Sequence, residues 1–79
     1  MSPNPFIREP VGDFASRLEA MNDDELFSTM SNLERASEAA EDVEEILARI
    51  ALTETEIERR YPGELLAPYR NWKQRQPML

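Results

Sequence analysis

Five basic and three aromatic side chains gather near the C-terminus, in the stretch ERRYPGELLAPYRNWKQRQ at residues 58–76. They are Arg59, Arg60, Tyr61, Tyr69, Arg70, Trp72, Lys73 and Arg75. A guanidinium group binds carboxylate or phosphate through two parallel hydrogen bonds, and Tyr and Trp rings offer planes for stacking. The same residue types are enriched at the strongest points of protein interfaces. We interpret these eight residues as a candidate binding site for a partner protein or a phosphate-containing ligand.

A structural role explains the same residues equally well. Leu65, Tyr69 and Trp72 share one face of a helix at spacings of four and three, so that the rings can pack against the rest of the chain. The bases would then face water or pair with acidic side chains. No spacing in this stretch is diagnostic of a known site, and the sequence alone leaves both interpretations open.

The net charge changes sign along the chain. The whole sequence has 16 acidic and 9 basic residues, for a net charge of −7, which argues against general affinity for nucleic acid or anionic lipid. Most acids precede residue 59, and many lie in one helical stretch: Glu38, Glu41, Asp42, Glu44, Glu45, Glu54, Glu56 and Glu58. With Arg49 as the only base between them, they form either a docking surface for a basic partner or a solvated helix exterior.

The composition argues against catalysis. The chain has no Cys and no His, which excludes a Cys nucleophile, a His general base and a structural zinc site. The acids lie in helical sequence and not in an Asp-rich loop of the calcium-binding kind. We therefore predict a protein that is not an enzyme and that carries no metal and no cofactor.

The sequence gives no sign of export or of a membrane span. The N-terminus MSPNPFIREPVGDF lacks the apolar run of a signal peptide, and no window approaches the roughly 20 apolar residues of a spanning helix. The absence of cysteine is compatible with a reducing cytoplasm. We expect a cytoplasmic protein that does not contact a membrane.

The chain divides into three parts. Three prolines and Gly12 predict an extended arm at residues 1–12, because proline fixes φ and restricts the residue before it. Residues 13–61 contain no Gly or Pro and are rich in strong helix formers, which predicts a helical body. Pro62 and Gly63 stop the helix, and residues 62–79 form a turn with a short helix at about 69–75. The predicted fold class is all-α.

The stretch MNDDEL at residues 21–26 marks a boundary within the body. Asn22 and Glu25 have the spacing of a capping box, in which each side chain satisfies the other residue's backbone N–H. We predict a short helix at about residues 11–21 and a new helix that begins at Asp23.

A heptad-like apolar stripe follows the second helix, with one three-residue slip near Ala40. Its members are predicted to form an oligomer interface: Leu26, Met30, Leu33, Val43, Leu47, Ile50 and Ile57. An unbroken helix from Asp23 to Arg60 would be about 57 Å long, whereas a compact domain of this size is only about 30 Å across. The helix therefore either breaks in ASEAAED at residues 36–42, with Ser37 as cap, or stays long and pairs with a second chain. We favour a coiled-coil-like homodimer.

Together, these features predict a helical hairpin or small bundle with one long helix, completed by dimerisation. The predicted function is that of a small acidic adaptor or inhibitor that binds, tethers or blocks a partner protein. The alternative is a protein that binds a nucleotide or nucleic acid through the C-terminal bases and rings.

Overall fold

The computed structural model describes residues 10–76, and every regular element among them is a helix. The helices are α2 (Val11–Ala20), α3 (Asp23–Ala39), α4 (Glu44–Arg60) and α5 (Ala67–Gln74). The predicted all-α class and small helical bundle are confirmed. Most of the predicted arm, residues 1–12, lies outside the described residues, as do residues 77–79.

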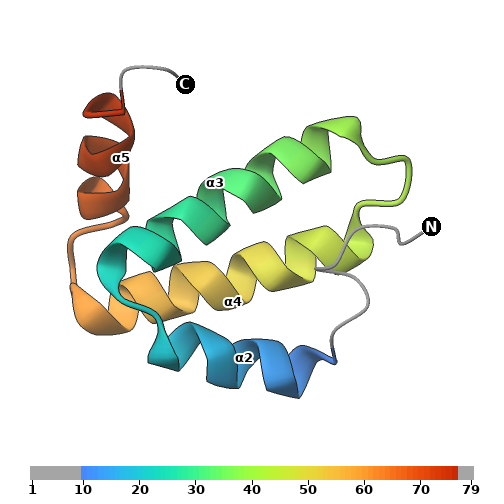
Figure 1. The fold of residues 1–79 in the computed structure, drawn as a ribbon, viewed down its shortest axis with the longest axis horizontal. Coiled ribbons are helices and arrows are strands. Elements are labelled where there is room, and N and C mark those ends of the chain that lie inside the picture. Colours follow the sequence, from blue (N-terminus) through green and yellow to red (C-terminus); the bar gives the residue numbers. More distant parts are fainter. Residues whose placement is uncertain (1–9, 77–79) are drawn as a thin grey trace.

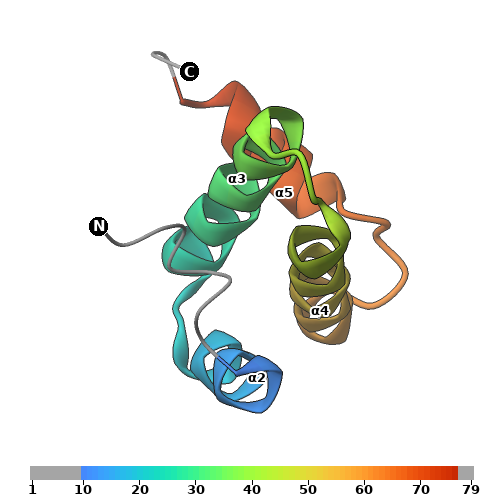
Figure 2. The same ribbon diagram turned by 90° about the vertical axis from the view of Figure 1, so that its right-hand side faces the viewer.

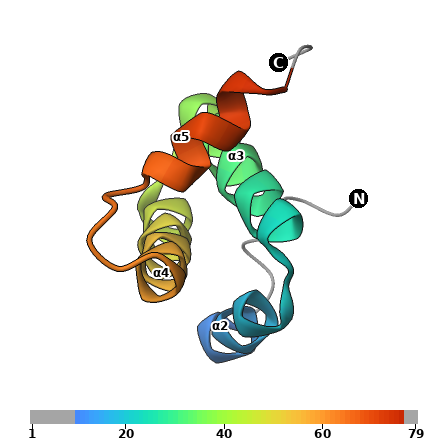
Figure 3. The ribbon, with the colours of Figure 1, turned by 90° about the vertical axis from the view of Figure 1, so that its left-hand side faces the viewer.

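Helices α3 and α4 form an antiparallel hairpin (Figure 1). Helix α2 packs along α4, and α5 crosses the end of the hairpin at which α3 begins and α4 ends (Figures 1 and 3). Viewed from the opposite end, α2, α3 and α4 occupy three corners around a common centre (Figure 2). The radius of gyration is 12.5 Å, close to the value of about 12 Å expected for one compact chain of this length.

The start of α3 has the capping box that the sequence predicts. The Asn22 side-chain oxygen accepts a hydrogen bond from the Glu25 backbone N–H at 2.8 Å. The Glu25 carboxylate accepts one from the Asn22 backbone N–H at 2.9 Å. Two backbone donors that the helix itself cannot satisfy are thus paired, which fixes the α2–α3 corner.

The predicted long helix breaks between Ala39 and Glu44. The break lies at the end of the predicted stretch, but Ser37 is not its cap, because the Ser37 hydroxyl donates back to the Glu34 carbonyl within α3 at 2.8 Å. The N-cap position of α4 is occupied by Val43, whose side chain offers no acceptor, and the Asp42 carboxylate before it accepts from the Glu44 backbone N–H at 3.2 Å. The chain reverses here, so α4 returns along α3.

One chain supplies the whole core. Its ten buried apolar residues come from all four described helices: Phe14, Leu18, Leu26, Phe27, Met30, Leu33, Ile46, Ile57, Tyr69 and Trp72. Four residues of the predicted oligomer interface, Leu26, Met30, Leu33 and Ile57, belong to this core. They pack against the same chain.

The other three residues of the predicted interface are more accessible. Val43 and Ile50 are partly buried, and Leu47 is 51% exposed. The length argument for a dimer no longer applies, because the helix is broken and α4 covers α3. Homodimerisation stays a prediction.

Adjacent positions on α4 test this arrangement. Ile46 is fully buried, whereas Leu47 faces solvent. Ile46→Asp should unfold the chain, because it buries a charge at a cost of several kcal/mol. Leu47→Asp should change the free energy of unfolding by less than about 1 kcal/mol. Thermal unfolding followed by circular dichroism measures both variants. Equal loss of structure in the two would place Leu47 in a buried seam with a second chain.

Candidate functional site

The C-terminal segment, residues 61–76, leaves α4 through a turn and ends in α5. Gly63 has a φ of 81°, in the left-handed region that glycine adopts without cost, and its N–H donates to the Glu58 carboxylate at 2.9 Å. Pro68 lies in the first turn of α5, where its missing N–H is not needed. The helix begins two residues before the predicted start and ends at Gln74.

The three aromatic side chains of this segment pack on Phe27 of α3. The ring centroids of Tyr61, Tyr69 and Trp72 lie 6.5, 5.9 and 6.0 Å from that of Phe27. Tyr69 and Trp72 also stack on each other at 6.2 Å. Both are buried, with exposed fractions of 3% and 8%. Tyr69 and Trp72 thus belong to the core, whereas Tyr61 is partly buried.

Each ring also donates a hydrogen bond to a carboxylate of α3. The Tyr61 hydroxyl donates to Asp23 and the Trp72 indole N–H to Asp24, the latter at 2.7 Å. The Tyr69 hydroxyl donates to Glu34 at 2.7 Å. Burial, together with the bond to Glu34, raises the pKa of Tyr69 far above its usual value, so it stays a donor. We call these three contacts the aromatic latch.

Two of the predicted binding bases, Arg59 and Arg60, form ion pairs with acidic side chains of the same chain. Arg60 bonds Asp23 at 2.9 Å, Glu56 at 2.7 Å and the Leu18 carbonyl at 2.9 Å. Arg59 bonds Glu56 at 2.6 Å. Glu56 is buried, and the guanidinium groups of Arg59 and then Arg60 hold its pKa below the usual value although burial acts the other way. Arg60 thereby joins α4 to α2 and α3, whereas the Arg59–Glu56 pair lies within α4.

The remaining predicted bases lie on the outer face of α5. Arg70 and Arg75 are exposed, and Arg70 donates to the Leu65 carbonyl at 3.0 Å. Lys73 lies 3.3 Å from Glu34 and 5.6 Å from the centre of the Tyr69 ring. The eight predicted residues therefore do not form one surface: Arg70 is exposed and Lys73 pairs with Glu34, whereas Arg75 shares a hollow of about 460 Å³ with Tyr61 and Trp72.

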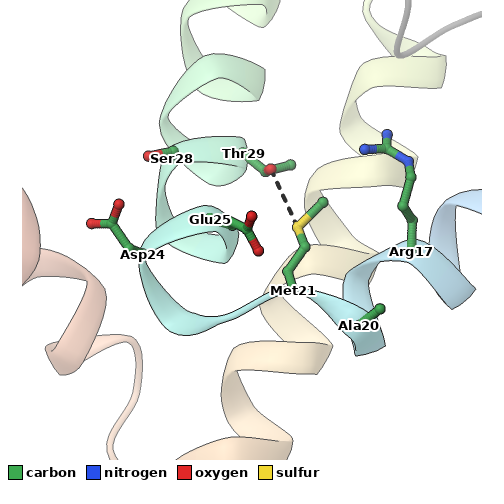
Figure 4. Close-up of a pocket in the computed structure, with 7 residues that line it drawn as sticks. All are labelled: Arg17, Ala20, Met21, Asp24, Glu25, Ser28 and Thr29. Atoms are coloured by element: carbon green, nitrogen blue, oxygen red, sulfur yellow. Dashed lines mark hydrogen bonds between the residues drawn. The ribbon is translucent and has the colours of Figure 1, made fainter.

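A shallow hollow of about 510 Å³ lies at the α2–α3 corner (Figure 4). Its lining combines charged, hydroxyl and thioether side chains: Arg17, Ala20, Met21, Asp24, Glu25, Ser28 and Thr29. Several of these already have partners within the fold. Glu25 belongs to the capping box, Asp24 to the aromatic latch, and the Thr29 hydroxyl donates to the Met21 sulfur at 3.5 Å. These three lining residues therefore have structural contacts of their own.

A second hollow, of about 530 Å³, lies between α4 and the turn that follows it. This turn lies beside α4, on the side away from α3 (Figures 2 and 3). The lining residues are Ala51, Glu54, Thr55, Glu58, Leu65 and Leu66, and we call this site the Leu65 groove. Its surface is mainly apolar, with two glutamates as its only charged lining residues.

Leu65 is the most unusual residue of this groove. Its side chain is 74% exposed, and Leu65 and Leu66 have φ angles of 55° and 67°. The left-handed region disfavours side chains with a Cβ, so two consecutive leucines there store strain. The sequence offered only a weak signal for this site, two consecutive leucines in the turn that follows Pro62 and Gly63.

Two charged residues of the predicted acidic face instead point inward. Arg49 is 1% exposed, bonds Glu45 at 2.6 Å and lies 5.8 Å from the centre of the Phe14 ring. Glu56 is held by Arg59 and Arg60. Both lie on the inner side of α4, where Arg49 reaches only Glu45 among the exposed glutamates of this helix that precede Arg59.

Within residues 10–76, no group of three or more acidic side chains is arranged to hold a metal ion. No helix of the same range is long and apolar enough to cross a membrane. Comparison with protein-family models, curated proteins and solved structures finds no match to this chain.

The aromatic latch predicts a measurable coupling between α5 and α3. Tyr69→Phe removes a hydrogen bond to a carboxylate and should cost about 1.5–3 kcal/mol. In a Glu34→Ala background the same change should cost less than about 0.5 kcal/mol, because the acceptor is already gone. Chemical denaturation of the four variants gives the coupling energy. An equal cost in both backgrounds would mean that the bond contributes nothing.

The ion pairs of Glu56 and Asp23 predict acid sensitivity. Arg59 and Arg60 lower the pKa of Glu56 from its ordinary 4.5, and Tyr61 and Arg60 lower that of Asp23 from 3.8. A lowered folded-state pKa stabilises the fold above the unfolded value, and this stabilisation is lost as pH falls through the folded value. The melting temperature should therefore fall below about pH 4.5.

Glu56→Gln should lower the melting temperature at pH 7 and make its decrease in acid shallower. Glu54→Gln, at an exposed position of the same helix, is the matched control and should keep the original pH profile. Scanning calorimetry from pH 3 to 7 compares the variants. An unchanged acid profile in Glu56→Gln would show that this carboxylate does not carry the effect.

Proposed function

We propose that this chain is a small non-enzymatic interaction protein that binds a partner protein through the Leu65 groove, as an adaptor or inhibitor. The observation that carries the proposal is Leu65, a large apolar side chain held 74% exposed on a strained backbone. Exposed apolar surface beside a groove is typical of protein–protein contacts. The proposal keeps the predicted class of function and moves the contact surface from the C-terminal bases to α4 and its turn.

Strain at Leu65 supports a functional role over a structural one. A residue in a sparsely populated backbone region costs about 1–3 kcal/mol, and such residues concentrate at binding and active sites. Glycine or asparagine would fit the same backbone at lower cost. Because most of the Leu65 side chain is exposed, it contributes little burial in return. A partner that covers the side chain would provide that burial.

The surroundings of the groove fit recognition and not catalysis. Its polar side chains are Thr55, Glu54 and Glu58, and the Thr55 hydroxyl donates to the Ala51 carbonyl of its own helix at 3.0 Å. Glu58 accepts from the Gly63 N–H and so helps to hold the turn. These groups orient a partner and shape the groove.

Leu65→Asn should separate binding from stability. Asparagine tolerates the left-handed region, so the melting temperature should stay the same or rise, while the apolar anchor is lost. The tagged protein, expressed in its source organism and purified with its bound proteins, should retain a partner that Leu65→Asn loses. Quantitative mass spectrometry of the two samples makes the comparison.

The matched control is Asn32→Ala, a polar change at an exposed position of α3. It should retain the same partner as the unmodified chain. If Leu65→Asn retains that partner equally well, the Leu65 groove is not the contact surface.

A further inference from the structure

We infer that the occupant of the Leu65 groove is a short amphipathic helix of a partner protein, with apolar side chains on one face and Lys or Arg beside them. This inference rests on the proposed function and names the chemistry of the partner.

The shape favours a helix. Leu47, Ala51 and Thr55 follow one another at intervals of four residues, so they form one line of about 12 Å along the outer face of α4. Small side chains at Ala51 and Thr55 allow close approach. The exposed Leu65 lines the groove, and the exposed Leu47 lies one helical turn before Ala51. A partner helix of two to three turns, with apolar residues at i, i+4 and i+7, matches this length.

The charge around the groove favours a basic partner. Glu54 and Glu58 line it, and the exposed Glu64 precedes Leu65 in the turn. Of two bases on this side, Arg59 is paired with an acid of its own helix, whereas Arg70 keeps its charge, so the three acids outnumber it. Arg59 bonds Glu56, and Arg70 bonds the Leu65 carbonyl. Acidic side chains beside an apolar surface attract a helix with cationic side chains next to its apolar face and repel an acidic one.

A second copy of this chain is a poorer occupant. Within residues 10–76, the exposed large apolar side chains are Leu65, which lines the groove, and Leu47, which lies one helical turn before Ala51. A symmetric contact between two copies would therefore bring α4 against α4. The outer glutamates of the two helices, Glu54 and Glu58 among them, would then face like charges, which disfavours the pairing.

Three synthetic peptides of equal length test the inference by nuclear magnetic resonance on the isotope-labelled full chain. The first is helical, with Leu at i, i+4 and i+7 and Lys beside them. The second has Glu in place of every Lys. The third has the composition of the first in scrambled order, so that its leucines share no face. It controls for general attraction of cations to a chain of net charge −7.

The first peptide should shift the backbone amide signals of Ala51, Thr55, Leu65 and Leu66, whereas the other two should leave these signals in place. Leu65→Asn should weaken its binding at least about tenfold, as loss of a central apolar anchor does. Glu54→Gln with Glu58→Gln should weaken it about fivefold and reduce its dependence on salt, since exposed charge pairs contribute little each. Glutamine at position 58 keeps an oxygen acceptor for Gly63.

Three outcomes would contradict this inference, and each would overturn a different part of it. Equal binding of the Lys and Glu peptides at these four amides overturns the basic chemistry but leaves the groove as a docking site. If no peptide shifts these amides, the helical occupant is wrong, and the Leu65→Asn purification separately decides the proposed function. If the same amides shift with protein concentration alone, a second copy occupies the groove and the inference fails.

Discussion

The chain reversal between Ala39 and Glu44 is the constraint on which the other contacts depend. Because α4 turns back along α3, one chain supplies both sides of an apolar core that a single long helix would have exposed. Helix α2 adds Phe14 and Leu18 to this core, and α5 adds Tyr69 and Trp72. The reversal also turns the remaining face of α4 to solvent. The same event that completes the fold therefore creates the surface proposed for binding.

The reversed charge of the C-terminal segment has a largely structural explanation. The first turn of α3 carries Asp23 and Asp24, which favour the helix N-terminus and need hydrogen-bond donors where they are partly covered. Tyr61, Trp72 and Arg60 provide those donors. An acidic body and a basic, aromatic end thus complement each other within one chain. Isolated surface ion pairs contribute little, but here the Trp72 donor belongs to a buried ring, and Tyr61 and Arg60 are themselves largely covered.

Local signals in the sequence predicted the elements better than their assembly. The Asn22–Glu25 capping box and the stop at Pro62 are short-range and were placed correctly. The slip in the apolar stripe near Ala40 marked the break, but periodicity alone cannot tell a reversal from a pairing of chains. Burial of Arg49 and Glu56 could not be predicted, because charged residues are rarely buried and their partners come from packing. The exposure of Leu65 likewise depends on the positive φ angles of Leu65 and Leu66, which leucine does not favour and which the sequence therefore does not indicate.

The distance between Asn32 on α3 and Glu58 on α4 tests the reversal most directly. Both positions are exposed, and the chain has no cysteine, so Asn32→Cys with Glu58→Cys can be spin-labelled without interference. Pulsed electron paramagnetic resonance, with labelled chain diluted into unlabelled chain, reports the distance within one molecule. The hairpin predicts about 20 Å, roughly the width of two packed helices. A distance near 40 Å, the span of an unbroken helix between these positions at about 1.5 Å per residue, would contradict the account.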